Sequence, residues 1–130
     1  MKIVKFYQSF RAVDYNDSST VSGWAFPSDK YIDLTLGATD ASYLAPANGW
    51  FSITKTAQGT GHMYLNMYNW DTKNNTRKLG TSCNTNHTVS GDSTLLANYI
   101  PAKKGDTIKI AYNLTGETMF FRFVYAEGEV

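Results

Sequence analysis

The sequence has very little charge, cysteine or proline for its length. Of its 130 residues 18% are charged, three are proline and one is cysteine, and the formal net charge is +1. Cys83 has no partner for an intrachain disulfide, so the fold depends on packing and not on an oxidising compartment. A net charge this close to zero provides no basic field for nucleic acid or for an anionic membrane, and we expect neither as a partner.

Long apolar segments are missing as well. No stretch approaches the roughly 20 apolar residues of a membrane-spanning helix, and we therefore expect no membrane insertion. Lys2 and Lys5 interrupt the first apolar residues, which lack the uninterrupted apolar centre of a signal peptide. The sequence thus predicts synthesis in a cytoplasm without an export signal.

Neutral polar and aromatic residues take the place of charge. The chain has 15 Thr, 10 Ser, 10 Asn and 10 Gly, and aromatic residues make up 15%. This composition favours strands and turns, and few segments repeat at the spacing of a helix. A mass of 14.5 kDa allows one core. We predict a single all-β domain over residues 1–130, with residues 1–26 forming an N-terminal strand and an attachment segment.

Alternation of apolar and polar residues locates the strands. Ile32, Leu34 and Leu36 alternate with Asp33 and Thr35, as in a half-buried strand. Further strands are predicted over residues 20–26, 50–54, 62–70, 95–100, 108–114 and 119–126, and the segment from 77 to 93 is the least regular. Eight to ten short strands separated by turns predict an antiparallel β-sandwich of jelly-roll type.

Three segments carry a resemblance to a known family. Residues 27–37, followed by residues 43–51 with Pro46 and the Asn48-Gly49 turn, resemble the C-terminal domains of bacteriophage fibre and appendage proteins. Residues 98–110, which contain a Lys-Gly-Asp turn, and residues 121–126 resemble the late strands of the same domains. Those domains are themselves similar to tumour necrosis factor-like jelly rolls.

The resemblance implies a homotrimeric knob on a virion that binds a host surface structure. The expected role is attachment, as a fibre knob, a head fibre or a capsid decoration, and the expected location is the virion after synthesis in the host cytoplasm. Other virion proteins and a host cell-surface glycan are the expected partners.

The strand over residues 62–70 supplies the candidate ligand site. Met63, Leu65 and Met67 lie on one face, and the other face is aromatic and polar. Aromatic rings stack on the C–H faces of sugars and amides bind sugar hydroxyls. We therefore expect glycan contacts at the end of this strand and beside the polar loop that ends at Thr20; the residues are Trp70, Asn69, Asp71 and Trp24.

A trimer also follows from the number of aromatic residues. They occur on both faces of several strands, more than a thin sandwich hides in one inner layer. Association about a three-fold axis buries a second face. The predicted interface residues are Tyr64, Tyr68, Tyr112, Phe121, Phe123 and Tyr125.

Catalytic and metal-binding patterns are weak. Cys83, His62 and His87 lack the spacing of a zinc site, and the carboxylates sit mostly in turns. We expect no enzyme activity, no cofactor and no metal. The alternative function is a monomeric, non-catalytic carbohydrate-binding module that stacks sugars on Trp24, Trp50 or Trp70. A fragment of a polysaccharide depolymerase would need a pair of carboxylates across a cleft, and the sequence offers no convincing pair.

Overall fold

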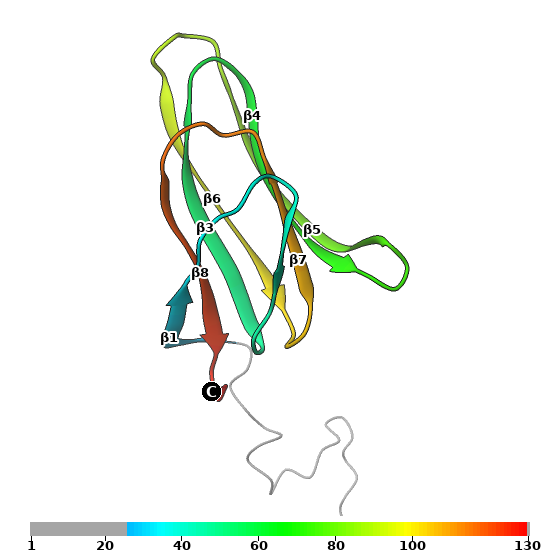
Figure 1. Cartoon of the computed structure of the whole chain (residues 1–130). Helices are drawn as coiled ribbons and strands as arrows, with labels where there is room; N and C mark the ends of the chain where they lie inside the picture. Colours follow the sequence, from blue (N-terminus) through cyan, green and yellow to red (C-terminus); the bar gives the residue numbers. More distant parts are fainter. Residues whose placement is uncertain (1–25, 130) are drawn as a thin grey trace, which may run out of the picture.

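Two four-stranded antiparallel sheets lie face to face in the computed structural model, which describes residues 26–129 (Figure 1). In spatial order, sheet A holds β1 (Pro27–Asp33), β8 (Thr118–Ala126), β3 (Gly49–Gln58) and β6 (Ser93–Ala102). Sheet B holds β2 (Ala41–Leu44), β7 (Thr107–Tyr112), β4 (Gly61–Asp71) and β5 (Thr76–His87). The predicted all-β sandwich is confirmed. Within the described range no helix is long and apolar enough to cross a membrane.

The strand pairing is nested. β1 pairs with β8, β2 with β7, β3 with β6 and β4 with β5, all antiparallel. The chain therefore runs as one long hairpin that is folded over itself, with a hairpin between β4 and β5 at its centre. This pairing favours the jelly-roll type, which stays a prediction.

The core lies between the sheets and follows the expected alternation. On β4, Met63, Leu65 and Met67 are buried and face Phe51 and Ile53 of β3 across the interior. The ring centroids of Phe51 and Phe123 lie 5.0 Å apart in an edge-to-face arrangement. Each fully buried side chain of this size stabilises the fold by about 1.5 to 3 kcal/mol.

Two predicted elements differ from the structure. The strand expected over residues 31–36 ends at Asp33, because the chain then crosses from sheet A to sheet B. Leu34 and Leu36 still pack against the core from this crossing segment. The N-terminal segment predicted over residues 1–26 and the strand predicted over residues 20–26 lie outside the described residues apart from Phe26. Pro27 begins β1, an edge strand, where proline is tolerated. The segment regarded as least regular contains β5, a strand of 12 residues.

Four of the predicted trimer residues face the interior. Phe121, Phe123 and Tyr125 are 2%, 0% and 8% exposed, because they occupy the inward positions of β8. Tyr112 is half-buried on the inner side of β7, where its hydroxyl donates to the Gly37 carbonyl at 2.7 Å. The prediction that Phe121, Phe123 and Tyr125 form a subunit interface is wrong, since the sandwich itself covers them. For the half-buried Tyr112 it stays a prediction.

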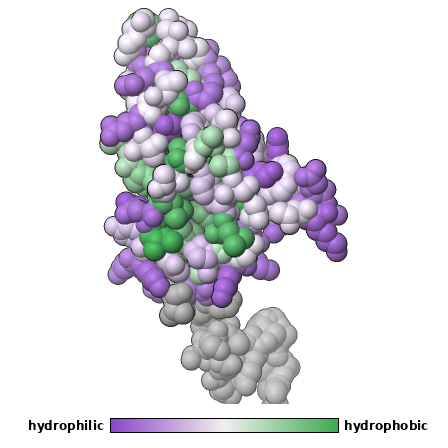
Figure 2. Space-filling model, viewed as in Figure 1, coloured by the Kyte–Doolittle hydropathy of each residue, from purple (hydrophilic) through white to green (hydrophobic). Residues whose placement is uncertain are grey.

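Hydrophilic and hydrophobic residues separate along the surface. Figure 2 shows hydrophilic residues over the projecting hairpin between β4 and β5, and hydrophobic residues gathered on the lower half of the face in view. Several large apolar side chains of the described residues are more than half exposed; they are Phe26, Leu44, Val89, Leu95, Tyr99 and Met119.

Candidate end-groove site

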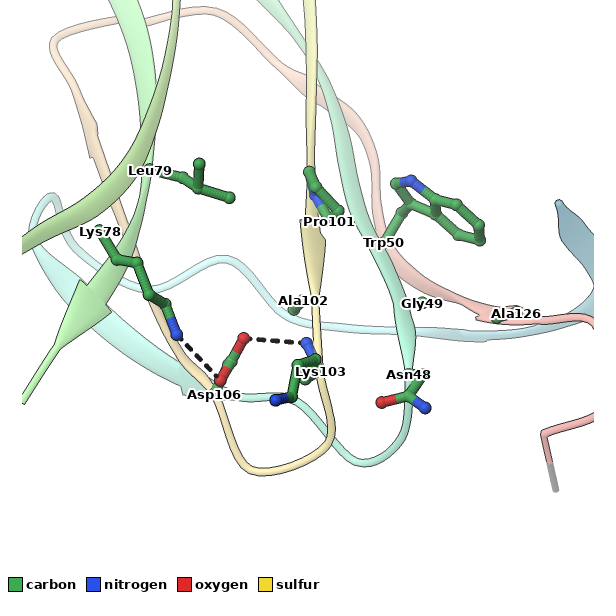
Figure 3. Close-up of a pocket in the computed structure, with 10 residues that line it drawn as sticks. All are labelled: Asn48, Gly49, Trp50, Lys78, Leu79, Pro101, Ala102, Lys103, Asp106 and Ala126. Atoms are coloured by element: carbon green, nitrogen blue, oxygen red, sulfur yellow. Dashed lines mark hydrogen bonds and ion pairs between the residues drawn. The ribbon is translucent and has the colours of Figure 1, made fainter. Parts of the chain in front are cut away.

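A groove of about 700 Å³ lies where strands from both sheets end. It lies near the start of β3 and the end of β6 in sheet A, and β5 of sheet B contributes the opposite wall (Figure 3). We call it the end groove. Its lining residues are Asn48, Gly49, Trp50, Lys78, Leu79, Pro101, Ala102, Lys103, Asp106 and Ala126.

Gly49 places the start of β3 against β8. A Cβ atom at this position would overlap the Val124 carbonyl oxygen and would lie 2.8 Å from the Phe123 ring. Only glycine therefore allows the two backbones to approach this closely. Trp50, the next residue, pairs with Val124 on one side and with Pro101 on the other, and this pairing places it among the residues that line the groove.

The wall of the groove is apolar. Pro101 lies between Trp50 and Leu79 in Figure 3, and Trp50 is half-buried while Leu79 is 48% exposed. Pro101 has no N–H, so its own backbone adds no donor to this wall. The Trp50 indole beside Pro101, with Leu79 on the other side of Pro101, provides apolar surface suited to the C–H face of a ring-shaped ligand.

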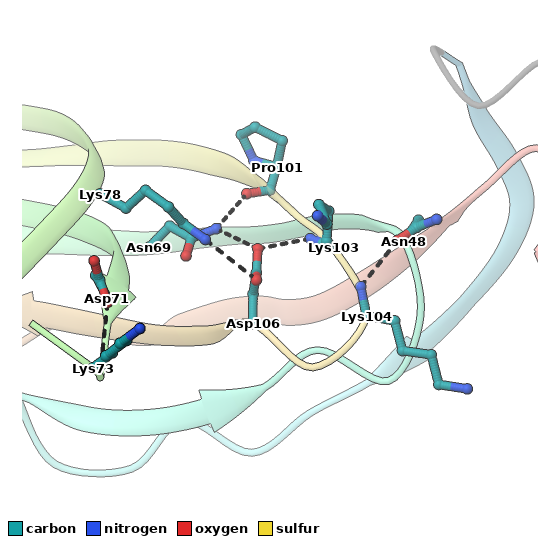
Figure 4. Close-up of polar contacts among 9 residues, drawn as sticks. All are labelled: Asn48, Asn69, Asp71, Lys73, Lys78, Pro101, Lys103, Lys104 and Asp106. Carbon is teal, nitrogen blue, oxygen red and sulfur yellow. Dashed lines mark hydrogen bonds and ion pairs between the residues drawn. The ribbon is translucent and has the colours of Figure 1, made fainter.

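The polar rim is centred on Asp106 (Figure 4). Its Oδ2 accepts hydrogen bonds from Asn69 Nδ2 at 2.8 Å and from the Lys103 N–H at 2.9 Å. Its Oδ1 lies 3.4 Å from Lys78 Nζ. Burial alone would raise the pKa of this carboxyl, but these hydrogen bonds and the Lys78 charge outweigh burial and lower it. Asp106 is therefore a fixed anion that holds β4, β5 and the turn after β6 together.

Asn69 supports the groove from the interior of the sandwich. It is 2% exposed, and its amide donates to Asp106 and to the Pro101 carbonyl, the latter at 3.3 Å. The prediction that Asn69 contacts a ligand is wrong, because it lies on the inward side of β4. It is instead a positioning residue for Asp106.

The other predicted ligand residues are dispersed. Asp71 is committed to its own turn, where it accepts hydrogen bonds from Lys73 and from the backbone and side chain of Asn74. The Asn74 side chain is the main cause of its lowered pKa. Trp70 is half-buried on the outer side of sheet B. Trp24 lies outside the described residues.

Tyr64 and Tyr68 lie on the same outer side of sheet B as Trp70. Both are half-buried, and the Tyr68 ring lies next to Gly80 of β5, where an added Cβ would be 3.3 Å from it. The predicted alternation of β4, with Met63, Leu65 and Met67 inward and the aromatic residues outward, is confirmed. Their role in a subunit interface stays a prediction.

The histidines and the cysteine do not converge. His87 is buried, and its ring nitrogens lie 2.9 Å from the Gly59 carbonyl and 2.8 Å from the Thr94 hydroxyl. His62 stacks on Tyr64 at a centroid distance of 6.3 Å. Across residues 26–129, no group of three or more His, Cys, Asp or Glu is placed to hold a metal ion.

Sequence reasoning gave Trp50 only as part of the alternative function and missed Lys78, Leu79 and Asp106. The Lys-Gly-Asp turn at Asp106 was visible as a charged turn, but nothing local linked it to β5. The link depends on pairing between distant strands, which brings Lys78 to a residue 28 positions away.

No protein-family model matches the sequence, and a search of curated proteins finds no match.

Proposed function

We propose that this chain is a non-catalytic attachment domain of a phage virion and that it binds a host-surface glycan in the end groove. The observation that carries the proposal is the position of Trp50, a half-buried indole at an apolar wall beside a polar rim. The resemblance of residues 27–51, 98–110 and 121–126 to phage fibre domains supports the virion setting.

The groove offers both kinds of contact that a sugar ring needs. The C–H face of the ring stacks on Trp50 and Pro101, while hydroxyl groups bind the carboxylate of Asp106 and the amine of Lys103. Asp106 is already held by three partners, so it is preorganised and little ordering is required on binding.

A single groove of this kind binds a glycan weakly, and strong adhesion comes from many grooves that bind at the same time. In a trimer three grooves are held in a fixed arrangement, and many trimers on one particle multiply the contacts, so that weak contacts add up to firm adhesion. Exposed Leu95, Tyr99 and Met119 of sheet A offer apolar surface that a neighbouring subunit would cover.

The test is a glycan array probed with wild-type protein, Trp50→Ala, Trp50→Phe and Val89→Ala. The wild type is expected to bind a defined set of glycans, and Trp50→Ala to lose at least about tenfold in affinity, as is usual for an aromatic anchor. Trp50→Phe keeps a flat ring and is expected to retain part of the binding. Val89→Ala changes an exposed side chain in the turn after β5 and serves as the control.

Two results would overturn the proposal. One is the absence of binding by the wild type both to the array and to host cells, which leaves a purely structural role. The other is equal binding by the wild type and Trp50→Ala, which moves the ligand away from the end groove.

The same groove also fits the alternative, a monomeric carbohydrate-binding module, because Trp50 is one of the residues expected to act as its stacking platform. The two functions share a ligand class and differ in assembly. The mass of the protein in solution therefore separates them.

A further inference from the structure

The outer face of sheet B carries two cations in close contact with two aromatic rings. Lys109 Nζ of β7 lies 4.2 Å from the centroid of the Trp70 ring, and the Arg77 guanidinium of β5 lies 4.2 Å from the centroid of the Tyr68 ring. Tyr68 and Trp70 are alternate residues of β4, which runs between β7 and β5. Each ring is therefore flanked by one cation on a neighbouring strand.

The register arranges these four residues as a compact block. Lys109 is directly opposite Tyr68, and Arg77 is directly opposite Trp70, so each cation reaches diagonally to the ring that it contacts. Strands lie about 4.8 Å apart, which places the two cation-bearing strands about 10 Å from one another. That span is comparable with the length of a disaccharide.

No carboxylate neutralises this block. Between residues 26 and 129 the ion pairs are Lys78 with Asp106 and Arg122 with Asp33, and neither includes Lys109 or Arg77. Asp71, at the end of β4, accepts hydrogen bonds from the Asn74 side chain and the Lys73 backbone N–H within its own turn and, in the described part of the chain, forms no ion pair with Lys109 or Arg77. The outward positions of the four strands carry Ser, Thr, Asn, Ala, Leu, Gly and aromatic residues beside these cations. The net charge of +1 thus conceals a local excess of positive charge.

We propose that this face is a second binding site, separate from the end groove, and that it takes an acidic glycan. The carboxylate of an acidic sugar binds Lys109 or Arg77, and the sugar ring lies against the edge or the free face of Trp70 and Tyr68. Charge complementarity selects this ligand over a neutral sugar. The site shares the proposed glycan-binding role of the chain but uses none of the groove residues.

The test follows the indole N–H signals of the tryptophans by NMR, because Trp70 reports on this face and Trp50 reports on the end groove. The probes are tetragalacturonic acid, its methyl ester and neutral maltotetraose, each added up to millimolar concentration. Tetragalacturonic acid is expected to shift the Trp70 signal, and the methyl ester and maltotetraose are expected to leave it in place. The response is expected to weaken with added salt.

Variants identify the residues that bind the acid. Lys109→Gln and Arg77→Gln are each expected to weaken binding of tetragalacturonic acid about threefold or more, as the loss of an exposed charged contact implies, while Lys109→Arg retains it. Lys30→Gln is the matched control, because Lys30 also lies over an aromatic ring, that of Tyr125 at 4.3 Å, but belongs to sheet A. These surface changes leave the core untouched.

Three outcomes overturn the second site: an unchanged Trp70 signal, an equal response to the neutral sugar, or unaltered affinity in Lys109→Gln and Arg77→Gln. An unchanged signal is also the result expected if a second copy of the chain covers this face. Because Trp50 is monitored in the same spectra, failure of this site and failure of the end groove are seen separately.

Discussion

Asp106 is the residue on which most of the end groove depends. One carboxylate connects Asn69 of β4, Lys78 of β5 and the backbone of Lys103, and so connects both sheets at one end of the sandwich. A half-buried anion with several donors is stable only while all of them remain in place, because each unpaired group then bears its own desolvation cost. The residue therefore links the stability of the fold to the shape of the groove.

Asp106→Asn is expected to lower the free energy of unfolding at pH 7 by about 1.5 to 3 kcal/mol, the range for hydrogen bonds to a charged group. The pKa of Asp106 is lower in the folded chain than its ordinary value of 3.8. The stabilisation is thus fully present above that value and is lost as the pH falls through the folded pKa. Urea denaturation of wild type and variant between pH 7 and pH 3 measures the difference.

Asp92→Asn is the control, because Asp92 lies in an exposed turn. It is expected to change stability by less than about 0.5 kcal/mol. An Asp106→Asn variant as stable as the wild type at pH 7 would contradict the role given to the carboxylate.

Lys55 is the second unusual residue, since it points into the sandwich and is 8% exposed. Its Nζ donates to the Gly116 carbonyl at 2.7 Å and to the Thr118 hydroxyl at 3.2 Å, and burial lowers its pKa. A lysine with a lowered pKa in the folded state makes the fold more stable as the pH rises from the folded pKa to the unfolded value of 10.5.

The expected result is that wild type gains stability relative to Lys55→Met as the pH is raised from 7 to 10. Thermal unfolding of both proteins in the same buffers measures the difference. A difference that does not change with pH would show that the ammonium group is not disfavoured in the fold.

At the scale of the element, the close contact between strands β3 and β8 depends on Gly49. Gly49→Ala is expected to destabilise the protein by about 3 kcal/mol or to prevent folding, because its Cβ meets backbone that cannot move aside. Gly80→Ala is the matched control, since its Cβ meets the Tyr68 ring at 3.3 Å and comes no closer than 3.9 Å to the backbone oxygen of Met67. Circular dichroism with denaturation compares the two, and equal stability of the two variants would contradict the packing at Gly49.

Alternation along the strands was enough to predict the class of fold and much of the core. The period of two in β4 assigned Met63, Leu65 and Met67 to the interior correctly. The same period cannot tell which side of a strand faces the other sheet, and for this reason Phe121 and Phe123 were assigned to a subunit surface. It also gave no sign that Leu34 and Leu36 belong to a segment that crosses between the sheets.

The candidate site was harder to predict than the fold. Trp50 and Asp106 are 56 positions apart in the sequence (106 − 50), and only the pairing of β3 with β6 brings them to one groove. The sequence places Asn69 on the strand that forms β4, which is correct, but predicts that its side chain lies at the surface. Its side chain is buried with its Nδ2 donating to Asp106 and to the Pro101 carbonyl, while its Oδ1 has no hydrogen-bond partner among the described residues, and no local pattern reveals such distant partners.

At the scale of the whole molecule, the proposal requires an assembly. Light scattering coupled to size exclusion is expected to give three times the chain mass of 14.5 kDa. Charging the exposed apolar surface of sheet A, as in Tyr99→Asp, is expected to release monomers with an intact fold, because Tyr99 is 64% exposed and contributes nothing to the core. A wild-type protein that elutes as a clean monomer would contradict the trimer and favour the carbohydrate-binding module.

The central claim is that a glycan binds in the end groove, and the most direct measurement is the indole N–H signal of Trp50 by NMR. The ligand is the strongest-binding neutral glycan from the array, titrated into the intact chain. The account predicts that the Trp50 signal moves with saturation while the Trp70 signal stays in place. A glycan that binds without moving the Trp50 signal would contradict the account.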